Sequence, residues 1–387
     1  MNGIVLFEEE ALWQDMLPLS FTRPVAAFRT GIFTQAERWQ KILNMPVYFD
    51  SMPYLREKFP PEIPGINCFI HASVIATKEL GERILNLKDG QALEHEGEII
   101  ARIGESVSEK IVYTSSLLKI KKPWDIFRFA DEVLRMDFEL MTKGRISQVL
   151  SDSNRLIGDK NALFIEEGAV VEASVLNTRS GPIYIAENAE IMESCSVRGP
   201  FYLGPNSQLK MGAKIYGASI FGPHVKVGGE VNNSVIFGYS SKAHDGFLGN
   251  SVLGEWCNLG ADTNNSNLKN NYAPVKLWNY RKEGFAQSGL QFCGLIMGDH
   301  SKSAINTMFN TGTVVGVSAN IFGAGFPRNF IPSFSWGGPQ AMQEYSLSQA
   351  VETAKRVFER RGMEFDEVEQ NIFKTIFDYS QKYRIGL

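Results

Sequence analysis

Apolar residues recur at every sixth position through the middle of the chain. A mostly small side chain stands two positions before each of them, and glycine often follows. A period of six fits neither a helix nor simple strand alternation, and it is typical of a parallel β-helix in which three hexads make one triangular coil. The pattern predicts a left-handed parallel β-helix of hexapeptide repeats over residues 151–335. The eight apolar positions that carry the period are Ile185, Ile191, Val197, Leu203, Leu209, Ile215, Phe221 and Val227.

The register of the repeat weakens after Val231-Asn232-Asn233, where we expect an extra turn or bulge. It resumes through Phe237, Ala243, Leu253 and Leu259. Residues 264–287 interrupt it with polar and aromatic side chains, which predicts a loop that leaves a coil. Loops on rigid scaffolds often carry function.

Other patterns flank the repeat. Short apolar runs alternate with a helical segment in residues 1–122, which predicts a reduced α/β domain. Apolar positions at helical spacing predict a connecting helix within residues 123–150. In residues 336–387, Ser346 and Asp366 are the expected N-caps of two helices that end near Arg361 and Tyr383 and cover the β-helix.

Composition narrows the class of protein. The 387 residues carry a net charge of −4 without a basic stripe, which argues against nucleic-acid binding. No apolar run is long enough for a membrane span, and the N-terminus lacks a signal-peptide pattern, so we expect a cytoplasmic protein. The four cysteines form no CxxC pair and fit a reducing compartment. The 35 glycines gather in the second half, where a β-helix needs corners.

The densest polar cluster surrounds His244. Histidine is the side chain whose ordinary pKa suits a general base near neutral pH. Because residues about one coil apart stack on the same face, Asn258 and Asn267 are expected to lie within a coil of His244. On spacing alone, His244 is either a catalytic base or a polar corner residue.

The same residues resemble a known family. Lys242-Ala243-His244, Phe247-Leu248-Gly249 and Asn258-Leu259-Gly260-Ala261 resemble the acetyltransferase half of the bifunctional UDP-N-acetylglucosamine pyrophosphorylase/glucosamine-1-phosphate N-acetyltransferase (GlmU) family. Over nearly its full length the chain resembles the variant GlmU-like sugar nucleotidyltransferases of Bacteroidetes-type bacteria. The stretches that carry this wider resemblance include LPLSFTRP, KPWDIF, GDHSKSAINTMFNTGTVVGV and FIPSFSWGG.

The resemblance implies an acyl transfer followed by nucleotide transfer. His244 would accept a proton from the 2-amino group of glucosamine-1-phosphate as that group attacks acetyl-CoA, while Asn258 and Asn267 position substrate and base. It also implies a homotrimer with active sites at subunit boundaries. The residues it assigns to acetyl-CoA binding are Gly298, Asp299, Ser301, Lys302 and Gly316.

The chain departs from the family pattern at the sugar site. Phe247 stands where the family has a sugar-binding tyrosine, and Leu268 replaces another tyrosine. The basic residues that hold the sugar phosphate are missing from positions 227–234. Lys242, Lys269 and Lys276 are the expected substitutes, which leaves the identity of the acceptor sugar open.

The front domain departs further. Phe7-Glu8-Glu9-Glu10 replaces the glycine-rich loop that cradles a triphosphate in sugar nucleotidyltransferases. Arg23 and Arg29 are the remaining candidates for nucleotide binding, with Mg²⁺ as the metal if this half is active; the sequence assigns no metal ligand. The domain is either a smaller nucleotidyltransferase for UTP or a degenerate one kept for architecture.

Other functions fit the same fold. A γ-type carbonic anhydrase would need His224, His244 and His300 around zinc. A further alternative is a nucleotidyltransferase for another sugar-1-phosphate, with a regulatory or structural β-helix.

Overall fold

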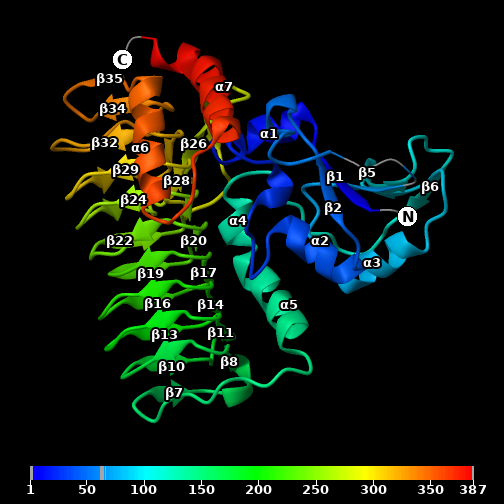
Figure 1. Cartoon of the computed structure of the whole chain (residues 1–387), viewed down its shortest axis with the longest axis horizontal. Coiled ribbons are helices and arrows are strands. Elements are labelled where there is room, and N and C mark those ends of the chain that lie inside the picture. The colour runs from blue at the N-terminus through cyan, green and yellow to red at the C-terminus, as the bar shows by residue number, and fades with distance from the viewer. Residues whose placement is uncertain (1–2, 62–64, 66, 386–387) are drawn as a thin grey trace.

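The computed structural model describes residues 3–61, 65 and 67–385. A tall β-helix carries a smaller α/β domain against one flank and two helices across its upper part (Figure 1). This arrangement confirms the predicted order of an α/β front, a β-helix and a helical extension.

The front domain is built on a six-stranded mixed sheet. β1 pairs in parallel with β2 and β3, and the remaining strands continue the sheet beyond β3. Thr34 and Glu37 form a reciprocal capping box at the start of α2. The strands in sheet order are β2 (Val47–Asp50), β1 (Ile4–Phe7), β3 (Cys68–His71), β5 (Glu98–Ile103), β4 (Gln91–His95) and β6 (Glu109–Val112); the helices are α1 (Glu10–Asp15), α2 (Gln35–Leu43) and α3 (Lys78–Leu85), with 3₁₀ turns at Leu19–Phe21, Val25–Ala27 and Pro53–Leu55.

A helical connection joins the front domain to the β-helix, as predicted. It consists of α4 (Asp125–Arg128) and α5 (Ala130–Thr142), separated at Phe129. Val133, Leu134 and Phe138 bury one face of α5.

Three parallel sheets form the β-helix. Sheet A contains β7 (Arg155–Ile157), β10 (Val175–Asn177), β13 (Ser196–Arg198), β16 (Lys214–Tyr216), β19 (Glu230–Asn232) and β22 (Phe247–Gly249). Sheet B contains β8 (Leu163–Ile165), β11 (Ile183–Ile185), β14 (Phe201–Leu203), β17 (Ser219–Phe221), β20 (Val235–Ile236), β23 (Val252–Leu253), β28 (Leu295–Met297), β31 (Thr313–Val315) and β33 (Phe330–Ile331). Sheet C contains β9 (Val170–Val171), β12 (Glu190–Ile191), β15 (Gln208–Leu209), β18 (Lys226–Val227), β21 (Ser241–Lys242), β24 (Asn258–Leu259), β29 (Lys302–Ser303), β32 (Asn320–Ile321), β34 (Ser335–Gly337) and the antiparallel β35 (Met342–Glu344).

The hexad residues line the interior of the coils. All eight apolar positions of the predicted period are at most 2% exposed. Ile191 lies in register with Leu209, and Leu209 with Val227, so each side chain stacks on the next coil. Each burial contributes roughly 1.5–3 kcal/mol before the entropy of ordering is subtracted. The predicted period is therefore confirmed as the core of the β-helix.

The prediction of an extra turn after Val231 is wrong, because the coil there is shorter. Ile215 pairs with Val231, sixteen residues on, and Val227 pairs with Lys242, fifteen residues on, instead of eighteen. Gly228 permits the tight corner, since a Cβ there would lie 2.3 Å from the Ala243 carbonyl oxygen. The inward positions consequently fall on Ile236 and Lys242 rather than on Phe237 and Ala243.

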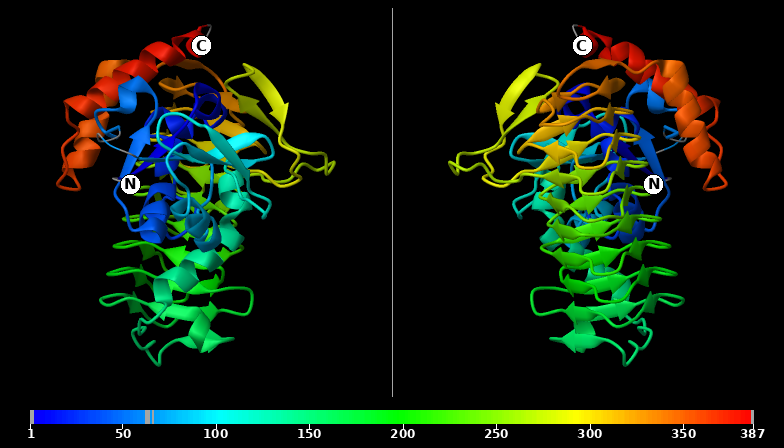
Figure 2. Two further views of the ribbon diagram at one scale, coloured as in Figure 1. Left: turned by 90° about the vertical axis from the view of Figure 1, so that its right-hand side faces the viewer. Right: turned by 90° about the vertical axis from the view of Figure 1, so that its left-hand side faces the viewer.

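The predicted excursion is present and contains a hairpin, β26 (Lys276–Asn279) and β27 (Gly284–Gln287). It projects beside the upper coils, where it appears in yellow in Figure 2. Trp278 stacks on Phe330 with ring centroids 4.2 Å apart, and the Asn279 amide donates to Asp15 of the front domain at 3.0 Å. Two further strands, β25 (Asn264–Asn265) and β30 (Met308–Phe309), pair beside its base.

The two C-terminal helices begin where the sequence predicts. Ser346 caps α6 (Leu347–Glu359), and Asp366 caps α7 (Glu367–Arg384). Phe358 of α6 stacks on Trp256 of the β-helix, and Lys58 of the front domain pairs with Glu369 of α7. The extension therefore contacts both bodies. Among the described residues, no helix combines the length and apolar character needed to cross a membrane.

Candidate functional site

His244 occupies the corner between sheets C and A. It follows β21, and its side chain is exposed. Gly246 makes the turn into β22 with φ +119°, and a Cβ there would lie 2.2 Å from the Thr263 carbonyl oxygen of the next coil. The close approach of these two coils holds the backbone of the His244 corner in place.

Lys242 lies inside the coil rather than on its surface. It stands in register with Val227 at an inward position and is 2% exposed. Its ammonium group donates to the His244 carbonyl oxygen. Burial lowers the pKa of Lys242 to about 8, an effect that the nearby Asp245 and Asp262 oppose. This burial does not fit the predicted contact with substrate, and it makes Lys242 a support of the corner.

The two candidate asparagines lie in different parts of the coils, Asn258 on sheet C and Asn267 at the corner between sheets A and B. Asn258 faces outward on β24, in register with Ser241 of the coil below. Asn267 lies at the corner between sheets A and B, where its amide donates to Asn250 Oδ1 at 2.8 Å. In the part of the chain that the structure describes, no hydrogen bond joins His244 to either asparagine.

Phe247 accompanies Asn267. Both approach Gly249, where a Cβ would lie 2.5 Å from Phe247 Cζ and 2.7 Å from Asn267 Nδ2. The structure therefore brings Asn267 and Phe247 together at one end of β22, with His244 at the other end. Their roles in binding substrate stay predictions.

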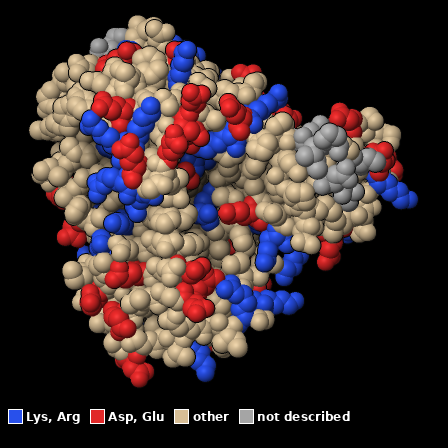
Figure 3. Space-filling view, in the orientation of Figure 1, with Lys and Arg blue, Asp and Glu red and all other residues tan. Residues whose placement is uncertain are grey.

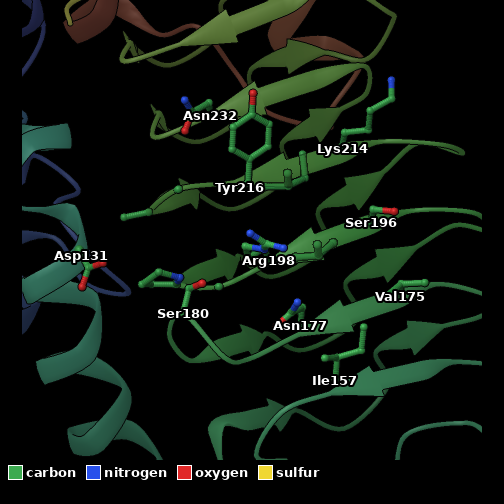
Figure 4. A pocket seen from close by; sticks show the side chains of 16 residues that line it. Asp131, Ile157, Val175, Asn177, Ser180, Ser196, Arg198, Lys214, Tyr216 and Asn232 are labelled. Atoms are coloured by element: carbon green, nitrogen blue, oxygen red, sulfur yellow. The ribbon is translucent and has the colours of Figure 1, made fainter. Parts of the chain in front are cut away.

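Sheet A carries a groove below β22. The cavity has a volume of about 720 Å³ and lies between the outer face of sheet A and Asp131 of α5 (Figure 4). In Figure 4 the side chains of Asn177, Arg198 and Tyr216 line one side of this space, while Ser196 and Lys214 lie toward the opposite end of the strands. The groove is open to solvent and rich in hydrogen-bonding groups.

Two cations in this groove were missed by the sequence analysis. The described residues include no ion-pair partner for Arg198 or Lys214, and both side chains are exposed. The nearest acidic groups are already engaged, because Asp131 pairs with Arg135 at 2.5 Å and Glu230 accepts from the Tyr216 hydroxyl at 2.6 Å. The sequence could have indicated these cations, because Arg198 and Lys214 are basic residues at outward positions of two successive coils.

The two predicted lysines of the excursion lie elsewhere. Lys269 donates to the Pro274 carbonyl oxygen at 3.2 Å, within the excursion itself. Lys276 is exposed on β26, in register with Gln287. Neither is among the residues that line the sheet A groove.

Arg23 and Asp299, which the sequence analysis assigned to two different ligands, form one buried ion pair. Arg23 also pairs with Glu255 at 2.7 Å, and Thr22 donates to Asp299 at 2.8 Å. Arg23 is 5% exposed and Asp299 is 2% exposed. The pair fastens the front domain to the β-helix, so neither side chain is free to meet a nucleotide or acetyl-CoA in this arrangement.

The neighbouring predicted acetyl-CoA residues brace the coils. Ser301 donates to the Gly316 carbonyl oxygen at 2.6 Å and is fully buried. A Cβ on Gly298 would lie 2.9 Å from the carbonyl carbon of Gly316, so this glycine permits close stacking. Lys302 faces outward beside Asn258 and donates to the His300 carbonyl oxygen at 2.8 Å. Burial lowers its pKa to about 8. Of the five residues predicted to bind acetyl-CoA, Lys302 is the one whose side chain lies beside Asn258 on the outer face of sheet C.

Arg29 lines a second cavity of about 720 Å³, between α2 and the lower part of sheet B. Its guanidinium is 3.6 Å from Glu37 and lies 6.0 Å from the Tyr202 ring centroid. The Arg29 guanidinium also donates to the Ile32 carbonyl oxygen, so it is held inside the front domain, and its role as a nucleotide contact stays a prediction.

The carboxyl ends of the parallel strands β1, β2 and β3 bring polar groups together. Glu8 accepts from Ser51 at 2.5 Å and from the Val25 amide at 2.7 Å, and burial raises its pKa to about 7. His71 lies 2.9 Å from Glu9. Ligands of open α/β sheets bind at such an edge. Across the described ranges, no group of three or more His, Cys, Asp or Glu side chains could hold a metal ion. The described residues therefore contain no prebuilt site for a cation.

The three histidines of the carbonic anhydrase alternative do not converge. His224 and His300 lie at the corner between sheets B and C, where rings stack along the β-helix, whereas His244 lies at the opposite edge of sheet C. His300 is 5% exposed. This separation disfavours a zinc site in one chain.

Comparison with known proteins agrees with this architecture. Residues 4–146 match the family model described as sugar nucleotidyl transferase. The chain is 34% identical over 87 residues to the bifunctional protein GlmU of Methanocaldococcus jannaschii, which covers 22% of this chain and 21% of that protein. It is 32% identical over 95 residues to the bifunctional protein GlmU of Methanococcus maripaludis. This match covers 24% of this chain and 22% of that protein. The matched stretches span about a fifth of the length of these relatives.

The match over residues 4–146 coincides with the front domain and the connecting helices described above. Residues 4–146 are similar to sugar nucleotidyl transferases, and part of the chain is similar to GlmU proteins.

Proposed function

We propose that the protein transfers an acetyl group from acetyl-CoA to the amino group of an amino-sugar phosphate, with glucosamine-1-phosphate as the acceptor. The observation that carries this proposal is the exposed His244 at the corner that leads into sheet A, because the outer face of the same sheet carries a groove with two cations that have no ion-pair partner among the described residues. A base and an anion-binding surface on the same sheet are what this reaction requires.

In the proposed reaction His244 accepts a proton from the attacking amine. The amine nitrogen forms a bond to the thioester carbonyl carbon, and the carbon–sulfur bond breaks. The departing thiolate takes the proton back from His244 and leaves as CoA. Lys242 holds the His244 carbonyl oxygen, and therefore the corner, during both proton transfers.

Arg198 and Lys214 are the groups that we assign to the acceptor phosphate. Strand β16 lies two strands from β22 in sheet A, which corresponds to about 10 Å at the usual strand spacing. Because the amino group and the phosphate of this sugar are on adjacent carbons, the side chains of Lys214 and Arg198 would have to extend along sheet A toward β22 to meet the phosphate, and Arg198 on β13 starts one strand further away than Lys214. In this proposal Arg198 and Lys214, which lie on lower coils, take the place of the basic residues that the family has at positions 227–234 and that this chain lacks.

We further propose that the front domain joins the acetylated sugar phosphate to UTP, giving UDP-N-acetylglucosamine and pyrophosphate. The match of residues 4–146 to sugar nucleotidyl transferases supports this half. Any Mg²⁺ would depend on nucleotide phosphates for most of its ligands, as is usual for this ion. The alternative is a nucleotidyltransferase for another sugar-1-phosphate with a regulatory or structural β-helix.

A homotrimer is part of the proposal. Large apolar side chains remain exposed along sheet C and its corner with sheet A, among them Val170 (50%), Met211 (71%) and Ile305 (68%). Packing of subunits would cover them. Light scattering that returned the mass of a single chain would contradict this part.

One assay separates the two proposed activities. The protein is incubated with glucosamine-1-phosphate, acetyl-CoA, UTP and Mg²⁺, and free thiol and pyrophosphate are followed separately. His244→Asn should lower thiol release by roughly 10²- to 10⁴-fold and leave pyrophosphate release from N-acetylglucosamine-1-phosphate intact. His95→Gln, in the front domain, is the histidine control for thiol release. Thiol without pyrophosphate in the wild type would refute the nucleotidyl half, and no thiol from this acceptor would refute the acetyl half as stated.

A further inference from the structure

Four basic side chains gather beside the C-terminal end of α6. Lys226 lies on β18, Lys210 directly follows β15, and Arg360 and Arg361 follow the last turn of α6. Lys and Arg side chains cluster on the face that carries the lower end of α6 (Figure 3). The four cations come from three elements that are far apart in the sequence.

Aromatic packing fixes the end of α6 above this part of sheet C. Phe358 stacks on Trp256 with centroids 4.2 Å apart, and the Arg361 amide donates to the Phe358 carbonyl oxygen at 2.8 Å. The two arginines therefore follow a residue that is locked against the corner between sheets B and C. Below Trp256 on that corner come Tyr239 and His224.

Within residues 3–61, 65 and 67–385, none of the four cations has an ion pair, and Lys210 only donates to Gln208 Oε1, at 3.1 Å. Burial and then the charges of Arg361, Lys210 and Arg360 lower the pKa of Lys226. Burial and Arg361 likewise lower the pKa of His224. The negative end of the α6 dipole favours the two arginines. It does not account for the two lysines that the sheet contributes to the same place.

A stack of flat rings runs beside the cations. His224 stacks on Tyr239 with centroids 4.9 Å apart and an interplanar angle of 15°, and Tyr239 stacks on Trp256 at 4.3 Å and 10°. His224 ends this stack and is half-exposed. Cations next to an accessible flat ring are the combination that binds phosphates and a base at once.

We propose that Lys210, Lys226, Arg360 and Arg361 bind the two phosphates of a nucleoside diphosphate, with its base against the His224 ring. The ligand is either the adenosine diphosphate part of CoA or the UDP part of a UDP-sugar, since both present the same groups. In the CoA case the inference rests on the proposed acetyl transfer. In the UDP-sugar case it holds without that transfer, as a product or regulator site.

Calorimetric titration of the full chain tests the site with three probes: CoA, UDP-N-acetylglucosamine and inorganic pyrophosphate. The double variant Lys226→Gln/Arg361→Gln should raise the Kd of one nucleotide probe at least about tenfold, because each charge-assisted hydrogen bond contributes roughly 1.5–3 kcal/mol. It should also flatten the salt dependence of binding. Arg356→Gln is the matched control, since Arg356 lies on the same helix but pairs with Glu352 at 2.5 Å.

The outcomes separate the two sources. Loss of CoA affinity alone supports the acyl-donor version, and loss of UDP-N-acetylglucosamine affinity alone supports the product version. Equal binding by wild type and double variant, binding of pyrophosphate only, or a change of oligomeric state without a change of Kd overturns the proposal. Thiol release by His244→Asn reports on the acetyl transfer separately from these Kd values, so failure of this site and failure of the acetyl transfer are distinguished.

Discussion

The Arg23 guanidinium and the Asp299 carboxylate form an ion pair that is buried between the front domain and the β-helix. The residues lie 276 positions apart in the chain. Glu255, which follows β23, also pairs with Arg23 and completes the cluster. The pair therefore adds one desolvated contact to those that place the two bodies relative to each other.

Removal of Asp299 should destabilise the protein. Asp299→Ala leaves the Arg23 charge buried with only Glu255 as a partner, and breaking such a pair costs about 3–5 kcal/mol. Denaturant unfolding measures the change. Asp131→Ala, which removes the exposed partner of Arg135, is the control and should cost less than about 1 kcal/mol. A loss from Asp299→Ala no larger than the control would show that the buried pair does not hold the bodies together.

Glu8 should make stability depend on pH. Its folded pKa is raised from 4.5 to about 7, so the folded state retains a proton that the unfolded state releases. Stability from this group is complete below pH 4.5 and is lost as pH rises to about 7. Glu8→Gln removes the charge; its amide oxygen can accept from the Val25 amide, and its amide nitrogen can donate to the Ser51 hydroxyl oxygen. It should raise the free energy of unfolding at pH 8 by up to roughly 3 kcal/mol but change little at pH 4.5. Parallel pH curves for wild type and variant would contradict the raised pKa.

Lys242→Met should make the protein more stable at pH 7 and slow acetyl transfer. The folded pKa of Lys242 is lowered to about 8, so the wild type bears a penalty below pH 8 that is relieved between pH 8 and its ordinary value of 10.5. The variant should melt at a higher temperature at pH 7, and this advantage should shrink over that window. Acetyl transfer should fall, because the His244 carbonyl oxygen loses its donor. A variant with full activity would remove Lys242 from the support of this corner.

Gly246→Ala should disturb the His244 corner. The new Cβ would lie 2.2 Å from the Thr263 carbonyl oxygen in a backbone conformation with φ +119°. Gly212→Ala is the matched control, because Gly212 also has positive φ but meets nothing within 4 Å. Conformational strain alone costs roughly 1–3 kcal/mol, so Gly246→Ala should unfold earlier than the control and lose acetyl transfer. Equal melting temperatures would contradict the close stacking of these coils.

Arg198→Gln and Lys214→Gln should weaken binding of the acceptor. Loss of a hydrogen bond to a charged group, roughly 1.5–3 kcal/mol, should raise KM for glucosamine-1-phosphate by about 10- to 100-fold with a smaller change in kcat. Glucosamine, which lacks the phosphate, should be acetylated equally by variant and wild type. An unchanged KM for the phosphorylated sugar would place the phosphate outside the sheet A groove.

The repeat could be recognised from the sequence because its rule is local. Ile191, Leu209 and Val227 each face the interior, and each pairs with the residue one coil along, so the spacing of apolar residues records the fold directly. The caps Ser346 and Asp366 are equally local, since each satisfies an amide three residues away. His244 was found by the same kind of reading, through the motif around it.

The features that could not be predicted from the sequence depend on the register between coils. The short coil at Gly228 moves the inward position to Lys242, which reverses the expected exposure of that lysine. Arg198 and Lys214 face the same groove only because coils stack, and Arg23 meets Asp299 only because the front domain docks on the upper coils. Hydrophobic period and capping thus determined the β-helix and its helices. The register between coils and the packing of the two bodies decided which polar groups are buried as supports and which remain free to bind, because desolvation and ion pairing are properties of the assembled surfaces.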